Sequence, residues 1–311
     1  MSRFPQLAPF TGGDGVVRVI GHRGARGVMP ENTIEGFDFT LSIGVTALEF
    51  DVVATADRVP VVTHNLHLAN SATRDAQGHW LTGPELRVAD LTLAELKTLD
   101  VGGLDGRTVY GQRFPDQAFM SGVRIPALSE LLDLCSKPGS EAYLLFELKS
   151  DPDLQDETAA RESLVATAVA EVRKFGLAHR TVLHSFDWKL LDECRRQAPD
   201  MPTSYLSQLP ENDDDPGEDS AKSVGPDYAT MTVSVPRAVA DAGGQLWCPY
   251  FMDLTPDLVA EAHDLGLPVC TWTVNETADI DRMIDAGVDG IVTDYPGRVQ
   301  RHLLNRGLRW Q

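Results

Sequence analysis

Close to its start the sequence reads Val16-Val17-Arg18-Val19-Ile20-Gly21-His22-Arg23-Gly24, a β-branched apolar run followed by a glycine-rich polar turn. The apolar run predicts a short buried strand, and the glycines after it predict a loop. His22 and Arg23 therefore follow directly after the carboxyl end of a strand. The same succession of strand, polar turn and helical pattern recurs along the chain, which predicts parallel strands joined by helices.

This alternation predicts an α/β protein built as a (β/α)8 (TIM) barrel. With 311 residues the chain could hold one barrel or two ordinary domains, and the alternation favours a single barrel domain over residues 1–311. The eight expected strands span residues 16–20, 47–53, 143–148, 181–185, 203–206, 246–250, 268–273 and 290–293. The expected helices span residues 33–43, 129–135, 158–175, 188–197, 256–265 and 277–286.

Three stretches do not follow the alternation. Residues 65–124 separate the second and third barrel strands by far more than an ordinary loop, which predicts a small insertion subdomain on the carboxyl face. Residues 210–223 are rich in Asp and Glu and predict a solvated acidic loop, because the spacing is not that of a helix-loop-helix calcium site. The apolar run at 228–235 is expected to form a loop or short helix outside the barrel.

Composition and charge narrow the range of partners. Hydrophobic residues make up 42% of the chain and charged residues 23%, as in ordinary soluble enzymes. The formal net charge of −19 argues against nucleic acid and anionic membrane surfaces as partners. No apolar run approaches the roughly 20 residues that cross a bilayer, so no integral membrane segment is expected. The four widely spaced cysteines indicate reduced thiols, and we expect a cytoplasmic protein.

Carboxylates gather where the second and third barrel strands end. Glu49 and Asp51 alternate along one strand, so their side chains project from the same face. Two buried carboxylates side by side repel unless a cation lies between them or one is protonated. Glu147 ends the next barrel strand and supplies a third oxygen ligand. Oxygen ligands alone favour one hard divalent cation, Mg²⁺ or Ca²⁺ or else Mn²⁺, over zinc.

Each of these features has an ordinary structural explanation when taken alone. A Glu-x-Asp pair on a strand commonly forms two surface ion pairs, and the pair of Glu147 and Lys149 commonly forms a solvated cross-strand contact. Their shared position at successive strand ends is not expected of independent surface residues. Together with Arg23 and Lys149, two residues suited to binding phosphate, the pattern predicts a metal-assisted site for a small-molecule phosphodiester.

In their order and spacing these motifs resemble the glycerophosphodiester phosphodiesterase family, which belongs to the phospholipase C-like barrel phosphodiesterases. The resemblance implies a TIM barrel with a small insertion after the second strand. It also implies hydrolysis of glycerophosphodiesters, such as glycerophosphocholine or glycerophosphoethanolamine, to sn-glycerol 3-phosphate and an alcohol, as part of glycerol and lipid metabolism. The motifs that carry it are Gly21-His22-Arg23-Gly24, Pro30-Glu31-Asn32-Thr33, Glu49-Phe50-Asp51-Val52, Thr55-Ala56-Asp57, His64, Glu147-Leu148-Lys149, Ser185-Phe186, Trp272-Thr273-Val274-Asn275 and residues 287–296.

The resemblance also implies roles for single residues. His22 and His64 are expected to be the catalytic acid and base, since imidazole titrates near neutrality, with a cyclic glycerol phosphate as intermediate. Glu49, Asp51 and Glu147 are expected to hold one divalent cation. Trp272, at the end of a late strand, is expected to stack on the glycerol group. In the family an Asp usually follows the last histidine of the signature, whereas Asn65 follows His64 here.

Three further residues near these motifs are expected to support the local structure or the site without reacting themselves. Asn32 is expected to cap the helix that begins at Thr33, with Glu35 completing a capping box. Glu31 either supports the site or anchors its loop, and His184 is expected to support the site from behind.

Two alternative activities follow from the same residues. A lysophospholipase D would need an apolar trough for an acyl chain, which aromatic residues of the insertion could line: Trp80, Tyr110, Phe114 and Phe119. A barrel lyase would use the divalent cation to stabilise an enediolate.

Overall fold

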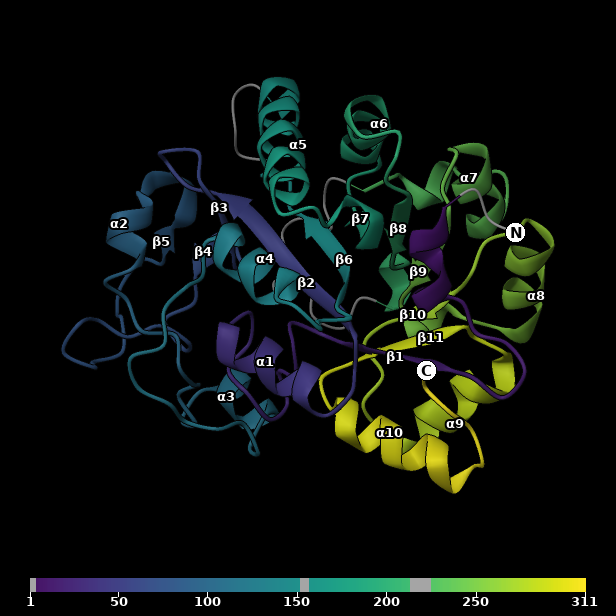
Figure 1. Ribbon diagram of the computed structural model, residues 1–311, viewed down its shortest axis with the longest axis horizontal. Coiled ribbons are helices and arrows are strands. Elements are labelled where there is room, and N and C mark those ends of the chain that lie inside the picture. Colours follow the sequence, from purple (N-terminus) through teal and green to yellow (C-terminus); the bar gives the residue numbers. More distant parts are fainter. Residues whose placement is uncertain (1–3, 152–156, 213–224) are drawn as a thin grey trace.

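The computed structural model describes residues 4–151, 157–212 and 225–311, and within them eight parallel strands form a nearly closed barrel (Figure 1). The two edges of this sheet are joined by isolated bridges between Trp247 and Val269 and between Tyr250 and Trp272. This confirms the predicted TIM barrel. The barrel strands, in sheet order, are β10 (Cys270–Thr271), β11 (Gly290–Thr293), β1 (Arg18–Gly21), β2 (Ala47–Ala54), β6 (Tyr143–Leu148), β7 (Thr181–Ser185), β8 (Thr203–Ser207) and β9 (Leu246–Pro249).

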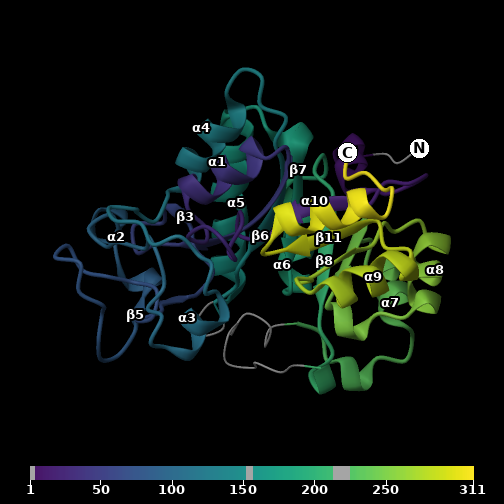
Figure 2. The same cartoon turned by 90° about the horizontal axis from the view of Figure 1, so that it is seen from below.

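Helices cover the outside of the barrel (Figures 1 and 2). Their ends follow local chemistry: Asp187 caps one helix by accepting from the amides of Lys189 and Leu190, and Gly287 ends another in the left-handed conformation at φ 85°. The outer helices are α1 (Ile34–Ser42), α4 (Leu128–Ser136), α5 (Glu157–Lys174), α6 (Trp188–Gln197), α7 (Val235–Asp241), α8 (Pro256–Asp264), α9 (Thr277–Ala286) and α10 (Pro296–Asn305). None of the helices in the described ranges is both long and apolar enough to span a membrane.

The amino-terminal end of the barrel is closed by the 3-10 helix η1 (Pro5–Phe10). Leu7 and Phe10 are buried in the same apolar cluster as the inward-facing side chains of the strands. The Cys270 thiol, at the start of β10, donates to the Phe10 carbonyl oxygen at 3.3 Å. Because this end is filled, the opposite, carboxyl end is the one at which a cavity can open.

Residues 65–124 form a lobe beside the carboxyl half of β2 (Figure 1). The short β3 (Pro60–Val62) first pairs antiparallel with β2, and the lobe then builds on this hairpin with an apolar cluster of its own that includes Val53, Val61 and Leu96. The elements of the lobe are β4 (His67–Leu68), β5 (Leu86–Arg87), η2 (Val88–Asp90), α2 (Leu93–Leu96) and α3 (Val109–Arg113).

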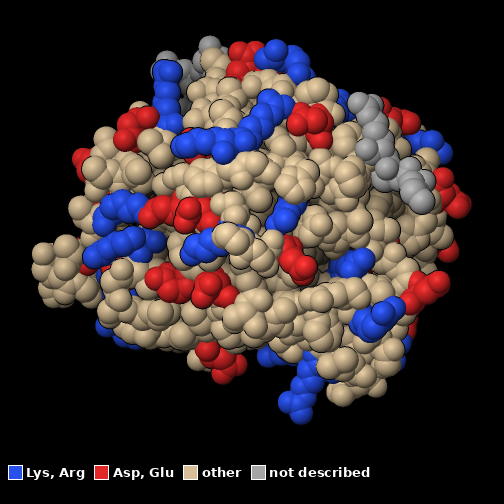
Figure 3. Space-filling view, viewed as in Figure 1, with Lys and Arg blue, Asp and Glu red and all other residues tan. Residues whose placement is uncertain are grey.

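Several sequence predictions differ from the structure in detail. β3, α7 and α10 were not expected, and the strand predicted at 268–273 is reduced to Cys270–Thr271 because only isolated bridges flank it. The apolar run at 228–235 contains the short 3-10 helix η6 (Tyr228–Thr230), as predicted. The acidic run predicted at 210–223 begins in η4 (Pro210–Asn212), and its remainder lies outside the described residues. On the face shown in Figure 3, basic and acidic side chains are interspersed.

Candidate active site

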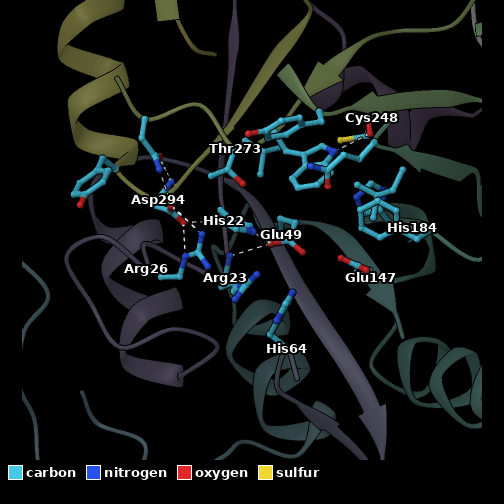
Figure 4. A pocket seen from close by; sticks show the side chains of 18 of the residues that line it. His22, Arg23, Arg26, Glu49, His64, Glu147, His184, Cys248, Thr273 and Asp294 are labelled. Carbon is cyan, nitrogen blue, oxygen red and sulfur yellow. Dashed lines mark hydrogen bonds and ion pairs between the residues drawn. The ribbon is translucent and has the colours of Figure 1, made fainter. Parts of the chain in front are cut away.

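A cavity of about 330 Å³ opens at the carboxyl end of the barrel (Figure 4). One half of its wall comes from β11, β1, β2, β3 and β6 and the turns that follow them, and it is charged. The other half comes from β7, β8, β9 and β10 and is mostly apolar. The charged half includes His22, Arg23, Arg26, Glu49, His64, Glu147 and Asp294, and the other half includes His184, Phe186, Leu206, Cys248, Tyr250 and Trp272.

The three carboxylates predicted to hold a metal come together in the charged half. Glu49 and Asp51 face inward from β2, and Asp51 lies opposite Glu147 in the parallel pairing of β2 with β6. One carboxylate oxygen from each of the three lies within 4.8 Å of the other two, and all three residues are buried. Glu49 Oε1 is buried and has no hydrogen-bond partner among the described residues. Close, buried carboxylates with an oxygen left over are the ligand set that a hard divalent cation requires.

The pKa values of Glu49 and Asp51 are shifted in opposite directions. Burial, and then the neighbouring charge of Asp51, raise the pKa of Glu49 to about 8. Burial would also raise the pKa of Asp51, but Lys149, His64 and Arg23 hold that pKa well below its ordinary value. Without a cation, Glu49 therefore carries the proton at neutral pH while Asp51 stays ionised. A divalent cation would relieve this repulsion, so the residues fit such an ion.

The two predicted phosphate-binding cations lie in different places. Arg23 lines the cavity, with Nη1 donating to Glu31 Oε1 at 2.9 Å and Nε 3.5 Å from Asp51 Oδ2. Lys149 is buried behind the carboxylates, with Nζ 3.1 Å from Asp51 Oδ1 and 2.8 Å from Glu147 Oε1. Lys149 lines a neighbouring groove between β2 and α5. Its amine is therefore placed to offset the carboxylates, whereas Arg23 is placed to reach a ligand.

His22 follows β1 and is held by Asp294, which follows β11. His22 Nδ1 lies 2.6 Å from Asp294 Oδ1, and Arg26 donates to both oxygens of the same carboxylate, from Nε at 2.8 Å and from Nη2 at 3.1 Å. Burial alone would raise the pKa of Asp294, but Arg26 and His22 hold it far below its ordinary value. An ionised Asp294 accepts a hydrogen bond from the protonated Nδ1, so Nε2 is the nitrogen of His22 that is left for chemistry.

His64 also has its Nδ1 tied to an oxygen acceptor. Nδ1 lies 2.7 Å from Asn65 Oδ1, and the His64 side chain lines the cavity. Asn65 can hold Nδ1 in the position where the family usually has Asp, because an amide oxygen accepts a hydrogen bond as a carboxylate oxygen does. What the amide does not supply is the negative charge. Figure 4 shows His22 and His64 reaching toward the same space from different elements.

The apolar half of the wall is built from aromatic rings in contact. Trp272 packs edge-on against Phe186, with ring centroids 5.4 Å apart, and its Nε1 donates to the Cys248 carbonyl oxygen at 3.0 Å. Tyr250 lies 5.2 Å from Trp272 between ring centroids. One polar group of this half is His184, whose Nδ1 lies 2.8 Å from Ser204 Oγ. Burial, together with the charge of Lys149, lowers the pKa of His184 to about 3, so this ring is neutral at pH 7.

The expected helix cap was wrong by one residue. Thr33, not Asn32, caps α1, with Thr33 Oγ1 accepting from the amide of Gly36 at 3.1 Å, and Glu35 forms no capping box. Asn32 adopts a left-handed conformation at φ 54° and donates from Nδ2 to Asp51 Oδ2 at 2.9 Å. Asn32 is therefore a direct partner of a candidate metal ligand.

The aromatic residues of the lobe do not form one apolar trough. Trp80 and Phe119 pack against the guanidinium of Arg74, at 5.4 and 4.4 Å from the ring centroids. Phe114 lines the cavity, but its ring lies against the guanidinium of Arg26 at 4.6 Å. Tyr110 contacts Glu31 and Arg26 through its hydroxyl group. These rings are occupied by charged groups, which does not favour an acyl chain as the ligand.

Two residues of the site were given no role by sequence reasoning. Asp294 belongs to a motif that carried the family resemblance, and its position directly after a barrel strand was the available signal. Arg26 gave no signal of its own. Its contact with Asp294 depends on the closure of the barrel, which brings these two residues, 268 positions apart, into an ion pair with two hydrogen bonds.

Known proteins resemble this chain over most of its length. The sequence profile of the glycerophosphoryl diester phosphodiesterase family matches residues 22–298. A glycerophosphodiester phosphodiesterase of Caldanaerobacter subterraneus subsp. tengcongensis is 28% identical over 279 residues, which cover 89% of this chain and 94% of that protein. The chain therefore belongs to the glycerophosphoryl diester phosphodiesterase family. It is a hydrolase of that class, as the motifs predicted.

Solved structures share its fold. A crystal structure of a protein from Silicibacter pomeroyi DSS-3, assigned to the glycerophosphoryl diester phosphodiesterases, is 67% identical, with a TM-score of 0.93 and coverage of 99% of this chain and 100% of that one. A phosphodiesterase from Oleispira antarctica, solved in complex with the product sn-glycerol-3-phosphate, has the same fold at 21% identity and a TM-score of 0.68. That likeness covers 93% of this chain and 97% of that one.

Proposed function

We propose that this enzyme hydrolyses glycerophosphodiesters of small alcohols, such as glycerophosphocholine or glycerophosphoethanolamine, to sn-glycerol 3-phosphate and the alcohol. The observation that carries the proposal is that His22, His64 and two of the three clustered carboxylates, Glu49 and Glu147, line one cavity, with Asp51 beside them. The Oleispira antarctica structure, which contains sn-glycerol-3-phosphate, supports the same product here.

Glu49, Asp51 and Glu147 would hold one divalent cation, Mg²⁺ or Ca²⁺. When bound, such a cation supplies Lewis-acid stabilisation of phosphate charge, worth several kcal/mol in the transition state. Arg23, whose side chain lines the cavity, would neutralise the remaining charge of the phosphate. Lys149 would contribute through its contacts with Asp51 and Glu147, which lower the net charge of the carboxylate group.

His22 and His64 would share the two proton transfers. A glycerol hydroxyl oxygen attacks phosphorus while one imidazole takes up its proton, and the other imidazole donates a proton to the alkoxide as the phosphorus–oxygen bond to the alcohol breaks. Water then opens the cyclic glycerol phosphate with the two transfers reversed, which regenerates both imidazoles. Asp294 and Asn65 hold the two Nδ1 atoms, so each Nε2 is oriented for this task.

Trp272 would pack against the glycerol carbons, since it lies in the apolar half of the wall at 5.4 Å from Phe186. A long acyl chain is a poorer fit, because the aromatic rings of the lobe are packed against Arg26 and Arg74. The four cysteines, all buried and unpaired, support the expected cytoplasmic location.

The test is phosphorus NMR of glycerophosphocholine incubated with metal-stripped protein to which Mg²⁺ or Ca²⁺ is added. We expect a phosphomonoester signal and an equal amount of free choline with at least one ion. A panel with other glycerophosphodiesters and lysophosphatidylcholine ranks the alcohols. Faster release of choline from lysophosphatidylcholine than from glycerophosphocholine would favour a lysophospholipase D. If none of the glycerophosphodiesters in the panel yields a monoester with either ion, the proposal is overturned.

A further inference from the structure

A short helix outside the barrel, α3 (Val109–Arg113), lies against the loop that carries His22 and Arg23. Thr108 Oγ1 begins the helix by accepting from the amide of Gly111 at 3.0 Å. Gly111 packs so closely that a β-carbon there would lie 2.1 Å from the Asp105 carbonyl oxygen. The turn before α3 is therefore tight, and it fixes where the side chains of the helix point.

Two side chains from α3 and its end reach the loop. The Tyr110 hydroxyl donates to Glu31 Oε2 and lies 3.4 Å from Arg26 Nη1. The Phe114 ring lies 4.6 Å from the guanidinium carbon of Arg26, in the geometry of a cation–π contact. Tyr110 and Phe114 also pack edge-on, with ring centroids 5.6 Å apart.

The chain that follows α3 is tied to the same loop. Gln117 Nε2 donates to the Arg26 carbonyl oxygen at 2.7 Å, and the amide of Ala118 donates to the Val28 carbonyl oxygen at 3.0 Å. The loop is thus held on one side by the barrel and on the other by α3 and the residues after it.

Both residues that Tyr110 contacts are bonded to groups of the proposed active site. Arg26 grips Asp294 with two hydrogen bonds, and Asp294 holds His22 Nδ1 at 2.6 Å. Glu31 accepts from Arg23 Nη1 at 2.9 Å. Two short chains of hydrogen bonds therefore begin at Tyr110. One runs through Arg26 and Asp294 to the imidazole of His22. The other runs through Glu31 to the guanidinium of Arg23.

We propose that α3 is a positioning element of the active site, and that Tyr110 acts through Glu31 and Arg26 to orient Arg23 and His22. This inference rests on the proposed phosphodiesterase function. The reason is geometric: a charged hydrogen-bond chain that is fixed at its outer end holds its inner end to one arrangement, and small displacements at a reacting centre are costly in rate.

The test compares Tyr110→Phe with wild type, because this change removes the hydroxyl and keeps the ring. We expect kcat/KM for glycerophosphocholine to fall about tenfold, as for loss of a hydrogen bond to a charged group. In a Glu31→Ala background the same change should cost less, about threefold, since only the route through Arg26 then remains and neighbours that act through one another are not additive. The Arg26→Ala variant should lose about 100-fold and recover in part when guanidinium is added.

Val109→Ser is the matched control, since Val109 is on the same helix, is 83% exposed and has no contact with the loop in the interactions described above. Hydrogen–deuterium exchange of residues 22–32 gives a readout independent of turnover, and it should quicken in Tyr110→Phe and not in Val109→Ser. A Tyr110→Phe enzyme with wild-type kcat/KM, or with the same loss in the Glu31→Ala background, overturns the inference, as does unchanged exchange. A wild-type enzyme inactive on every phosphodiester would instead end the proposed function.

Discussion

The two halves of the barrel mouth differ in what holds them together. On the side of β11, β1 and β2, charged groups are held by polar partners: Asp294 accepts from Arg26 and Asn275 and holds His22. On the side of β7 to β10, aromatic rings such as Phe186 and Trp272 pack against each other. Buried charge needs partners, whereas apolar surface needs only contact. The charged half should therefore govern turnover, and the apolar half should govern binding.

The largest expected effect is on the histidines of the charged half. His22→Ala and His64→Ala should each lower kcat by about 10²- to 10⁴-fold, because each removes one proton transfer. KM should change little, since neither ring is the main binding surface. Steady-state kinetics on glycerophosphocholine measure both constants. Turnover within a factor of a few of wild type in either variant would remove that histidine from the mechanism.

Removing one carboxylate should come next in size. Glu147→Gln keeps the shape of the side chain but loses its charge, so we expect a loss of about 10³-fold in activity at low Mg²⁺, in line with the several kcal/mol attributed to a bound cation. Raising the ion concentration should restore part of the activity. Equal activity of Glu147→Gln and wild type at all ion concentrations would argue that Glu147 holds no cation.

The raised pKa of Glu49 predicts how metal affinity depends on pH. Burial and Asp51 raise the pKa of Glu49 to about 8, so below that pH a cation must displace a proton from Glu49. Affinity should rise about tenfold per pH unit between pH 6 and 8 and level off above, with about one proton released at pH 7. Calorimetry in buffers of different ionisation enthalpy measures the released protons. A flat affinity between pH 6 and 8 contradicts this assignment.

The smallest effect should come from the apolar half. Trp272→Leu should raise KM for glycerophosphocholine about three- to tenfold through lost aromatic contact, with kcat nearly unchanged. Leu304→Ser, on the outer helix α10 and 58% exposed, is the control that should alter neither constant. A fall in kcat as large as that of the histidine variants would mean that the apolar half governs turnover as well as binding.

The part of this site that sequence predicts is the part set by short-range rules. The period of a strand places Glu49 and Asp51 on one face, and strand ends place His22 and Glu147 at one edge. The contact of Asp294 with His22 joins residues 272 positions apart and needs the pairing of β11 with β1. No pattern among neighbouring residues predicts the pairing of these two strands.

The misplaced helix cap has a different cause. Asn32 and Thr33 both cap helices well, and local propensity cannot choose between neighbours. Asn32 is drawn away by its hydrogen bond to Asp51, a tertiary contact. Likewise, the role of α3 depends on how the 65–124 lobe packs on the loop of Arg26, which a five-residue helix does not reveal in its sequence.

The most direct test of the central claim is a titration of metal-stripped enzyme with Mg²⁺ or Ca²⁺, in which bound ion and phosphodiesterase activity are measured together. The account predicts one ion per chain, activity that rises in step with its binding, and loss of that binding in Glu49→Gln. Full activity in the stripped enzyme, or one bound ion that survives the loss of Glu49, Asp51 and Glu147 together, would contradict it.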